Sequence, residues 1–149
     1  MHILSERDAE AVRNRLRALT QPVRLVYFTE GRSGLIIPGR ECQYCAETER
    51  LLEDLAGCSP LLSLEVHDRI TDPEAFAAHR VDKVPGLAVV GAQDYGVRYY
   101  GLPAGYELAC LLDIIVDVGR GATGLTAQTR AALGALPSEV WLQVLVTPT

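Results

Sequence analysis

The segment Cys42-Gln43-Tyr44-Cys45 decides the fold of this chain. It lies between an apolar run over 23–28, which predicts a buried strand, and a helical pattern over 43–56. Two cysteines separated by two residues at the first turn of a helix can close a small disulfide, and the helix N-terminus stabilises a thiolate there. The segment therefore predicts a redox-active dithiol, and its position after a strand makes the motif informative.

Length and composition indicate one globular domain, with room for part of another. The 149 residues are 48% hydrophobic and 22% charged, which is ordinary for a folded protein. The formal net charge of −5 argues against a nucleic-acid partner, because phosphates require a basic surface. No apolar run is long enough to span a bilayer, and residues 1–8 carry no secretory signal. We therefore expect a cytoplasmic protein without a membrane partner.

Hydrophobic periodicity predicts four further helices and four further strands. The helices cover 6–19, a short segment from Thr71 to His79, 105–118 and 126–136. The strands cover 61–67, 87–90, 97–100 and 140–146. The first two strands of the chain should be parallel through a crossover helix, whereas 87–90 and 97–100 should form an antiparallel hairpin.

This order of elements predicts an α/β fold of thioredoxin type, in which helices flank a mixed central sheet. An extra helix precedes it, and residues 1–120 would form one thioredoxin- or glutaredoxin-like domain. Residues 121–149 would form a linker helix and the first strand of a second, truncated unit. The reason is that Val144-Leu145-Val146-Thr147 resembles Val26-Tyr27-Phe28-Thr29.

The two cysteines of the motif are expected to differ in position and role. Cys42 should lie at the mouth of the helix, where a substrate disulfide can reach it, and should be the attacking thiolate. Cys45 should lie on the buried face of the helix with Leu52 and Leu55, and should be the resolving thiol. A structural zinc site and two chemically inert cysteines are the alternatives. Zinc needs about four ligands and a second ligand pair is missing, so we expect no metal and no cofactor.

Val84-Pro85-Gly86 precedes the predicted strand 87–90 and allows two interpretations. A proline there can simply mark the entry of a strand. Alternatively, Pro85 is a cis-proline packed against the dithiol, and a neighbouring backbone edge is free to pair with an extended substrate peptide. The upstream cysteine motif favours the second interpretation.

Several other residues carry weaker signals. Cys58 is expected to be a small buried or loop residue, because it follows a helix-capping glycine. Cys110 lies opposite the apolar stripe of its helix, and a cover from helix 126–136 or from a partner would account for it. His67-Asp68 is expected to be a solvated strand end. The apolar triplet Leu35-Ile36-Ile37 either folds inward or meets a partner.

Taken together, these segments resemble the tandem thioredoxin-fold protein disulfide oxidoreductases, also called glutaredoxin-like. The matching stretches, which span nearly the whole chain, are Pro22-Val23, Cys42-Gln43-Tyr44-Cys45, the run YGVRYYGLPAG over 95–105, Ile115-Val116-Asp117-Val118 and Val146-Thr147-Pro148-Thr149. The run over 95–105 is the most specific of them. The resemblance is to the N-terminal unit of such a protein.

The resemblance implies an enzyme that exchanges thiols and disulfides on proteins through Cys42 and Cys45, with Pro85 as the cis-proline. Its expected partners are protein disulfides or dithiols and a thioredoxin-reductase-like electron donor. Self-association is expected through the apolar residues 140–146, since an unpaired strand exposes hydrogen-bonding edges.

Two other functions remain open from the sequence. One is an electron-relay domain similar to the N-terminal domain of peroxiredoxin-reducing flavoproteins, which would serve a single partner. The other is a non-catalytic interaction module, in which the cysteine pair is incidental.

Overall fold

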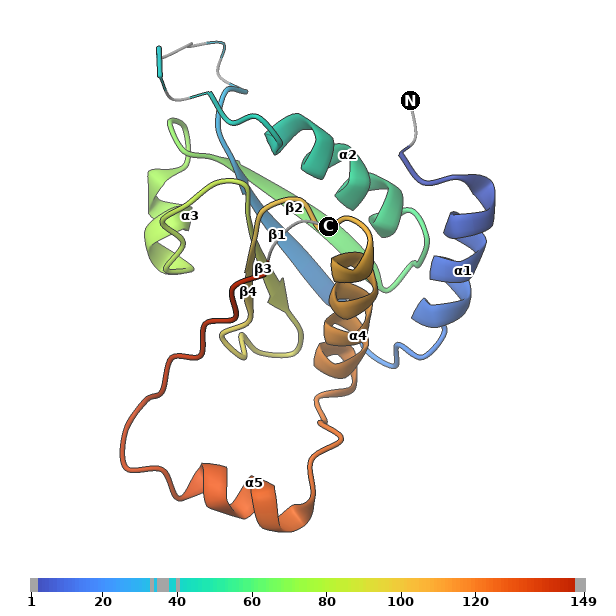
Figure 1. Ribbon diagram of the computed structural model, residues 1–149, viewed down its shortest axis with the longest axis vertical. Coiled ribbons are helices and arrows are strands. Elements are labelled where there is room, and N and C mark those ends of the chain that lie inside the picture. Colours follow the sequence, from blue (N-terminus) through green and yellow to red (C-terminus); the bar gives the residue numbers. More distant parts are fainter. Residues whose placement is uncertain (1–2, 33, 35–37, 40, 147–149) are drawn as a thin grey trace.

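The computed structural model describes residues 3–32, 34, 38–39 and 41–146 (Figure 1). In chain order it contains α1 (Glu6–Leu16), β1 (Val23–Thr29), α2 (Cys45–Ala56), β2 (Leu62–Asp68), α3 (Pro73–Ala78), β3 (Gly86–Val90), β4 (Arg98–Tyr100), α4 (Tyr106–Arg120) and α5 (Ala127–Gly134). The triplet Leu35-Ile36-Ile37 and residues 147–149 of the matching ending lie outside the described residues. None of the helices described is long and apolar enough to cross a membrane.

The four strands of the described residues form one mixed sheet in the order β2-β1-β3-β4. β1 pairs in parallel with β2, Val23 opposite Leu62, and antiparallel with β3, Phe28 opposite Gly86. β3 and β4 form the predicted antiparallel hairpin. Because β1 has a strand on each side and helices above and below, all its residues except Arg24 are buried, as its apolar run predicts. The predicted thioredoxin-like α/β fold is confirmed.

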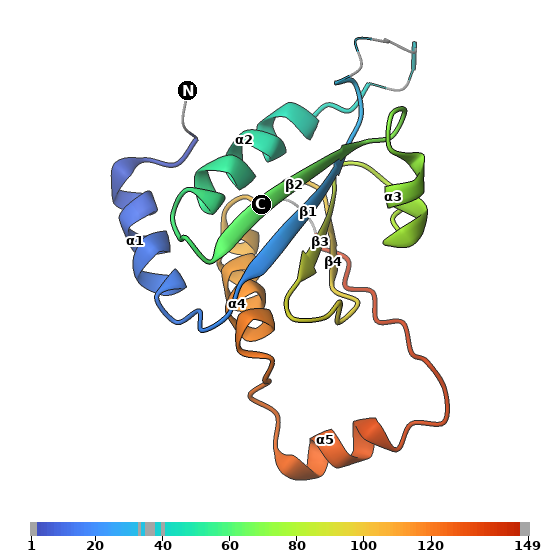
Figure 2. The same cartoon turned by 180° about the vertical axis from the view of Figure 1, so that it is seen from behind.

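Helices cover both faces of the sheet (Figures 1 and 2). Successive residues of a strand point to opposite faces. Leu25 and Tyr27 of β1 therefore join the larger core cluster, to which α1, α2 and α4 contribute. Val26 and Phe28 join a smaller cluster that includes Phe76 of α3. The two clusters pack on opposite faces of β1 and fix its C-terminal end. The loop that leads to the cysteine motif begins at this end.

The N-terminal helix packs on the larger cluster. Ser5 caps α1, since its Oγ accepts a hydrogen bond from the Asp8 N–H at 3.2 Å. Val12 and Leu16 are buried. The helix ends at Leu16, three residues earlier than predicted, because the chain has to turn before Pro22 and enter β1.

Gly119 allows α4 to approach the start of β1 closely. A Cβ atom at this position would overlap Leu19 Cδ2 and would lie 3.1 Å from Val23 Cγ2. Both contacts are closer than an ordinary van der Waals contact, so a side chain at this position would require the Leu19 and Val23 side chains to move.

The C-terminal segment, residues 121–146, differs from the sheet domain, residues 3–120. Every residue of this segment is exposed, and α5 buries none of its side chains. The sequence predicted a strand over 140–146, but these residues have no regular secondary structure. A strand needs a neighbouring strand to bond its backbone N–H and C=O groups, and no described strand pairs with residues 140–146. In Figures 1 and 2 the chain returns from α5 towards β4. Glu139 of this returning stretch forms an ion pair of 3.2 Å with Arg80, which follows α3.

Candidate active site

Cys42 and Cys45 are joined by a disulfide, with an S–S distance of 2.02 Å and a Cα–Cα distance of 5.4 Å. α2 begins at Cys45, two residues later than predicted, and Tyr44 is its N-cap. Cys42 therefore lies in the turn before the helix, which a hydrogen bond from Cys45 N–H to Cys42 O closes at 3.5 Å. Among the residues described, no cluster of three or more His, Cys, Asp or Glu side chains could hold a metal ion.

The two cysteines differ in exposure. Cys42 is half-buried, whereas only 3% of Cys45 is exposed. Cys45 belongs to a buried face of α2 that also contains Leu51, Leu52 and Leu55. Cys42 is therefore the more exposed cysteine of the disulfide, and Cys45 is held against the core.

Tyr27 fastens the start of α2 to the sheet. Its ring is fully buried in β1, and its hydroxyl donates a hydrogen bond to the Cys45 carbonyl oxygen at 2.8 Å. Burial raises the pKa of Tyr27 to about 12, so the hydroxyl keeps its proton. Sequence reasoning missed this role. The signal was a tyrosine within a buried aliphatic strand, since a buried phenol usually finds a hydrogen-bond partner.

Glu49 lies one helical turn after Cys45, and only 14% of its side chain is exposed. Burial raises the pKa of the Glu49 carboxyl, while the nearby Arg32 opposes that shift. The Arg32 guanidinium forms an ion pair with Glu49 at 2.9 Å. A half-buried carboxylate paired with a cation therefore lies on the same helix as the disulfide, and sequence reasoning did not select it.

Asp68 holds Arg32 in place. Only 4% of Asp68 is exposed, and its two carboxylate oxygens accept hydrogen bonds from the Arg32 and Ile70 N–H groups, each at 2.8 Å. The prediction that His67-Asp68 is a solvated strand end is therefore wrong for Asp68, because the chain after β1 folds over it. His67 stacks on Phe28, on the face of the sheet that α3 covers.

Pro85 lies at the same end of the sheet as the disulfide. The Val84–Pro85 peptide bond is cis, and Pro85 directly precedes β3. The next residue, Gly86, pairs with Phe28, the neighbour of Tyr27, which in turn contacts Cys45. The Pro85 carbonyl accepts a hydrogen bond from Gly101 N–H at 3.0 Å, and the backbone groups of Val84 make none within the described part of the chain.

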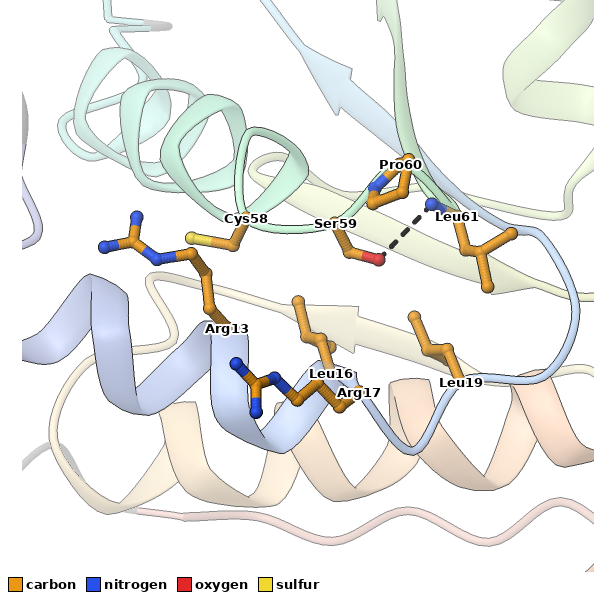
Figure 3. A pocket seen from close by; sticks show the side chains of 8 residues that line it. All are labelled: Arg13, Leu16, Arg17, Leu19, Cys58, Ser59, Pro60 and Leu61. Atoms are coloured by element: carbon orange, nitrogen blue, oxygen red, sulfur yellow. Dashed lines mark hydrogen bonds between the residues drawn. The ribbon is translucent and has the colours of Figure 1, made fainter.

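The other two cysteines lie apart from the disulfide. Cys58 follows the opposite end of α2 and lines an open pocket of about 350 Å³ between α1 and the start of β2, together with Arg13, Arg17 and Leu61 (Figure 3). Burial raises the pKa of the Cys58 thiol, which disfavours its thiolate. Cys110 is exposed on α4, and α5 does not cover it.

Solved structures similar to this chain include the following three. A protein disulfide oxidoreductase from Aeropyrum pernix k1 is 29% identical, with a TM-score of 0.77, over 91% of this chain and 57% of that one. The NTD_N/C domain of alkylhydroperoxide reductase AhpF from Enterococcus faecalis is 22% identical, with a TM-score of 0.75, over 90% and 61%. A mutant form of AhpF from the same organism is also 22% identical, with a TM-score of 0.74 and the same coverage.

These matches concern part of each relative, since this chain spans less than two thirds of their length. Comparison with family profiles and with curated proteins found no match. The resemblance inferred from the sequence is confirmed by the structural match. The chain is therefore a thioredoxin-fold domain with a C-x-x-C disulfide, similar to one part of a protein disulfide oxidoreductase.

Proposed function

We propose that this chain is a thiol–disulfide oxidoreductase that acts on protein disulfides through Cys42 and Cys45. The observation that carries the proposal is the disulfide at the start of α2, with one cysteine half-buried and the other buried. This asymmetry suits a pair in which Cys42 attacks and Cys45 resolves. The N-terminus of α2 favours the thiolate form of a cysteine held there.

In the reducing direction, the Cys42 thiolate attacks one sulfur of a substrate disulfide. A bond forms between Cys42 and that sulfur, the substrate disulfide breaks, and its second sulfur leaves as a thiolate. Cys45 then attacks Cys42, the intramolecular disulfide forms, and the remaining substrate sulfur leaves with its electron pair. The substrate gains two electrons and the dithiol loses two, which a thioredoxin-reductase-like donor would restore. The reverse sequence would form disulfides in a substrate.

The segment before β3 would bind the substrate. Val84 has free backbone groups within the described chain and lies next to Pro85, at the end of the sheet where Tyr27 meets Cys45. An extended peptide could pair with such an edge through its main chain. That pairing would bring a cysteine of the peptide near Cys42.

Reduction of insulin disulfides in the presence of a chemical thiol tests the proposal. We expect the wild-type chain to accelerate the reaction and Cys42→Ser to abolish the acceleration. Cys45→Ser should instead trap a mixed disulfide with a protein substrate, because nothing resolves it. Cys110→Ser, which removes an exposed cysteine outside the site, is the matched control and should be fully active. Wild-type protein without activity, or Cys45→Ser that traps nothing, would contradict the proposal.

The same assay separates the alternatives. The structural similarity to alkylhydroperoxide reductase keeps the electron-relay function under consideration, and a relay that serves one partner should reduce insulin poorly. An interaction module should not reduce it at all. The reduction potential of the Cys42–Cys45 couple would then give the physiological direction, because about 30 mV corresponds to a tenfold change in the exchange equilibrium.

A further inference from the structure

We propose that Arg69 is a positioning residue, which fixes the backbone edge at Val84 where a substrate peptide would bind. This inference rests on the proposed function and deepens it, since it concerns how the substrate is held and not how the sulfurs react. It is based on the contacts of Arg69 with three parts of the chain. These parts are the end of β1, helix α3 and the segment before β3, residues 82–84.

The backbone of Arg69 is tied to the end of β1. Arg69 directly follows β2, in the turn that leads to α3, and α3 lies beside the end of β2 in both views of the fold (Figures 1 and 2). Its N–H donates a hydrogen bond to the Thr29 carbonyl oxygen at 2.9 Å, and Thr29 is the last residue of β1. The position of Arg69 is therefore fixed relative to the strand whose Tyr27 hydroxyl bonds to Cys45.

The guanidinium of Arg69 is held on two sides. Its central carbon lies 5.2 Å from the centre of the Phe76 ring on α3, within the range of a cation–π contact. Its Nε atom lies 3.7 Å from a carboxylate oxygen of Glu30, whose side chain is only 18% exposed. A planar guanidinium between a ring and a carboxylate has little freedom to turn. These two contacts therefore restrict the direction in which its terminal N–H groups point.

One of these N–H groups holds the segment before β3. Arg69 Nη2 donates a hydrogen bond to the Asp82 carbonyl oxygen at 3.0 Å, and among the described residues this is the one hydrogen bond that the backbone of the segment makes. On the other side of Val84, the Pro85 carbonyl oxygen accepts a hydrogen bond from Gly101 N–H at 3.0 Å. Val84, whose backbone groups are free within the described chain, therefore lies between two fixed carbonyl groups. Such an edge suits the addition of an extended peptide.

The other side-chain contacts of this segment do not replace Arg69. Lys83 Nζ bonds to the Asp82 carboxylate at 3.1 and 3.2 Å and lies 5.5 Å from the centre of the Tyr100 ring. The Lys83 and Asp82 side chains are 68% and 71% exposed, so water competes for their ion pair and its contribution is small. Neither contact of Lys83 involves the main chain of the segment. Arg69 is therefore the side chain that fixes this backbone.

Loss of the Arg69 side chain should affect the binding of peptides and not the exchange of sulfurs. The Asp82 carbonyl would lose its partner, and the segment would gain conformational freedom. A bound peptide would then have to order the segment, and the entropic cost of that ordering would lower its affinity. None of the Arg69 contacts within the described chain involves Cys42 or Cys45, so the reactivity of the cysteines should be retained.

Two disulfide substrates separate peptide binding from sulfur chemistry. Insulin presents its cysteines on a peptide, whereas dithiobis(nitrobenzoate) has no main chain that could pair with an edge. The protein carries Cys58→Ser and Cys110→Ser, so that both reactions come from the site. We expect Arg69→Met to raise the KM for insulin about tenfold, as for the loss of one charge-assisted hydrogen bond, and to keep kcat within about twofold. Its rate with dithiobis(nitrobenzoate) should equal that of the wild type.

Arg24→Met is the matched control and should change neither reaction. Arg24 is an exposed arginine paired with Glu65 near the start of β1, away from the end that leads to the cysteine motif. Arg69→Lys keeps the charge but lacks the planar group that stacks on Phe76, so it should recover part of the affinity for insulin. If Arg69→Met does not fold, Phe76→Leu serves as the second test. It removes the ring beside the guanidinium and should also raise the KM for insulin.

Two results would overturn the role of Arg69. One is a wild-type KM for insulin in folded Arg69→Met, or in Phe76→Leu where that variant takes its place. The other is an equal loss of rate with both substrates, which would mean that the whole site is disturbed and not the peptide edge alone. Absence of insulin reduction by the wild type would instead overturn the proposed function, and the role of Arg69 with it.

Discussion

The sheet domain and the C-terminal segment are both rich in apolar residues, yet they bury them to opposite extents. Leu111 of α4 has no exposed surface, because it packs in the larger core cluster. Leu145 is 94% exposed, and its neighbours Leu142 and Val144 are nearly as open. An apolar sequence stabilises a fold only when another element covers it, since the free energy comes from the area removed from water.

This difference in burial depends on which elements pack beside each region and not on its local sequence. β1 has β2 on one side and β3 on the other, whereas the apolar run over 140–146 has no strand beside it within the described chain. The similarity between 26–29 and 144–147 therefore does not produce similar structures. Four sets of measurements, from the largest expected effect to the smallest, sharpen or break this comparison.

Two leucine truncations test the difference directly. We expect Leu111→Ala to lower the free energy of unfolding by about 2–5 kcal/mol, because it removes buried methyl groups and leaves a cavity. Leu145→Ala should change it by less than about 0.5 kcal/mol, as is usual for exposed sites. Urea denaturation of both variants measures these values. A large effect of Leu145→Ala would show that the C-terminal segment packs in solution.

Two glycine substitutions test close packing. Gly119→Ala should destabilise the chain by about 1–3 kcal/mol, since the new methyl group meets the Leu19 and Val23 side chains. Gly134→Ala in α5 meets nothing within 4 Å and should leave the cooperative unfolding transition in place. Thermal unfolding followed by circular dichroism compares the two. Equal stability of Gly119→Ala and the wild type would mean that α4 shifts without cost.

Asp94 provides a pH-dependent test within the sheet domain. Its carboxylate receives two hydrogen bonds from Arg98, at 2.6 and 2.9 Å, and this lowers the pKa of Asp94 to about 2. Because the pKa of Asp94 is lower in the folded state, the ionised carboxylate stabilises the fold at pH values above its ordinary pKa of 3.8. This contribution is lost as the pH falls through about 2. Because the Asp94 side chain is 35% exposed, we expect only about 1 kcal/mol.

Asp94→Asn should therefore be less stable than the wild type near neutral pH. The difference in the free energy of unfolding between the two proteins should become smaller as the solution is acidified. Glu139→Gln, which breaks the exposed pair with Arg80 in the C-terminal segment, is the control and should leave stability unchanged. Urea midpoints over a pH series give both results. A constant difference between Asp94→Asn and the wild type down to the lowest pH would contradict the assignment.

Deletion of residues 138–149 should have the smallest effect on the sheet domain. Residues 138–146 are all exposed, so we expect the unfolding transition and the thiol–disulfide exchange rate to be retained. Self-association of the full chain, which we expect through 140–146, should fall in the truncated chain, as measured by sedimentation velocity. A monomeric full chain, with 140–146 protected from hydrogen exchange, would indicate that these residues pack on their own domain.

Local patterns in the sequence were sufficient for much of the fold. The apolar run of β1, the helical stripe of α2 and the Ser5 cap each depend on neighbours within a few residues. The cysteine motif was recognisable for the same reason, because its spacing and its position after a strand are local features.

The remaining features depend on contacts between distant residues. The antiparallel pairing of β1 with β3 follows from the register of segments about 60 residues apart, and no local pattern encodes it. The connection from Asp68 through Arg32 to Glu49 requires β2, the chain after β1 and α2 to meet. The prediction of a strand over 140–146 was wrong because it, too, depended on a distant contact. Periodicity indicates which side chains of a segment could be buried, but it does not indicate whether another element is present to cover them.

The central place of β1 in the sheet has a consequence for synthesis of the chain. β1 leaves the ribosome before both of its partners, since Val23 pairs with Leu62 and Phe28 pairs with Gly86. Until residue 90 has emerged, its apolar side chains and at least one backbone edge lack their native cover. A nascent chain of this length therefore exposes apolar surface that the folded chain buries, and mutations that slow pairing of β3 should lower the yield of soluble protein more than the stability of the molecules that fold.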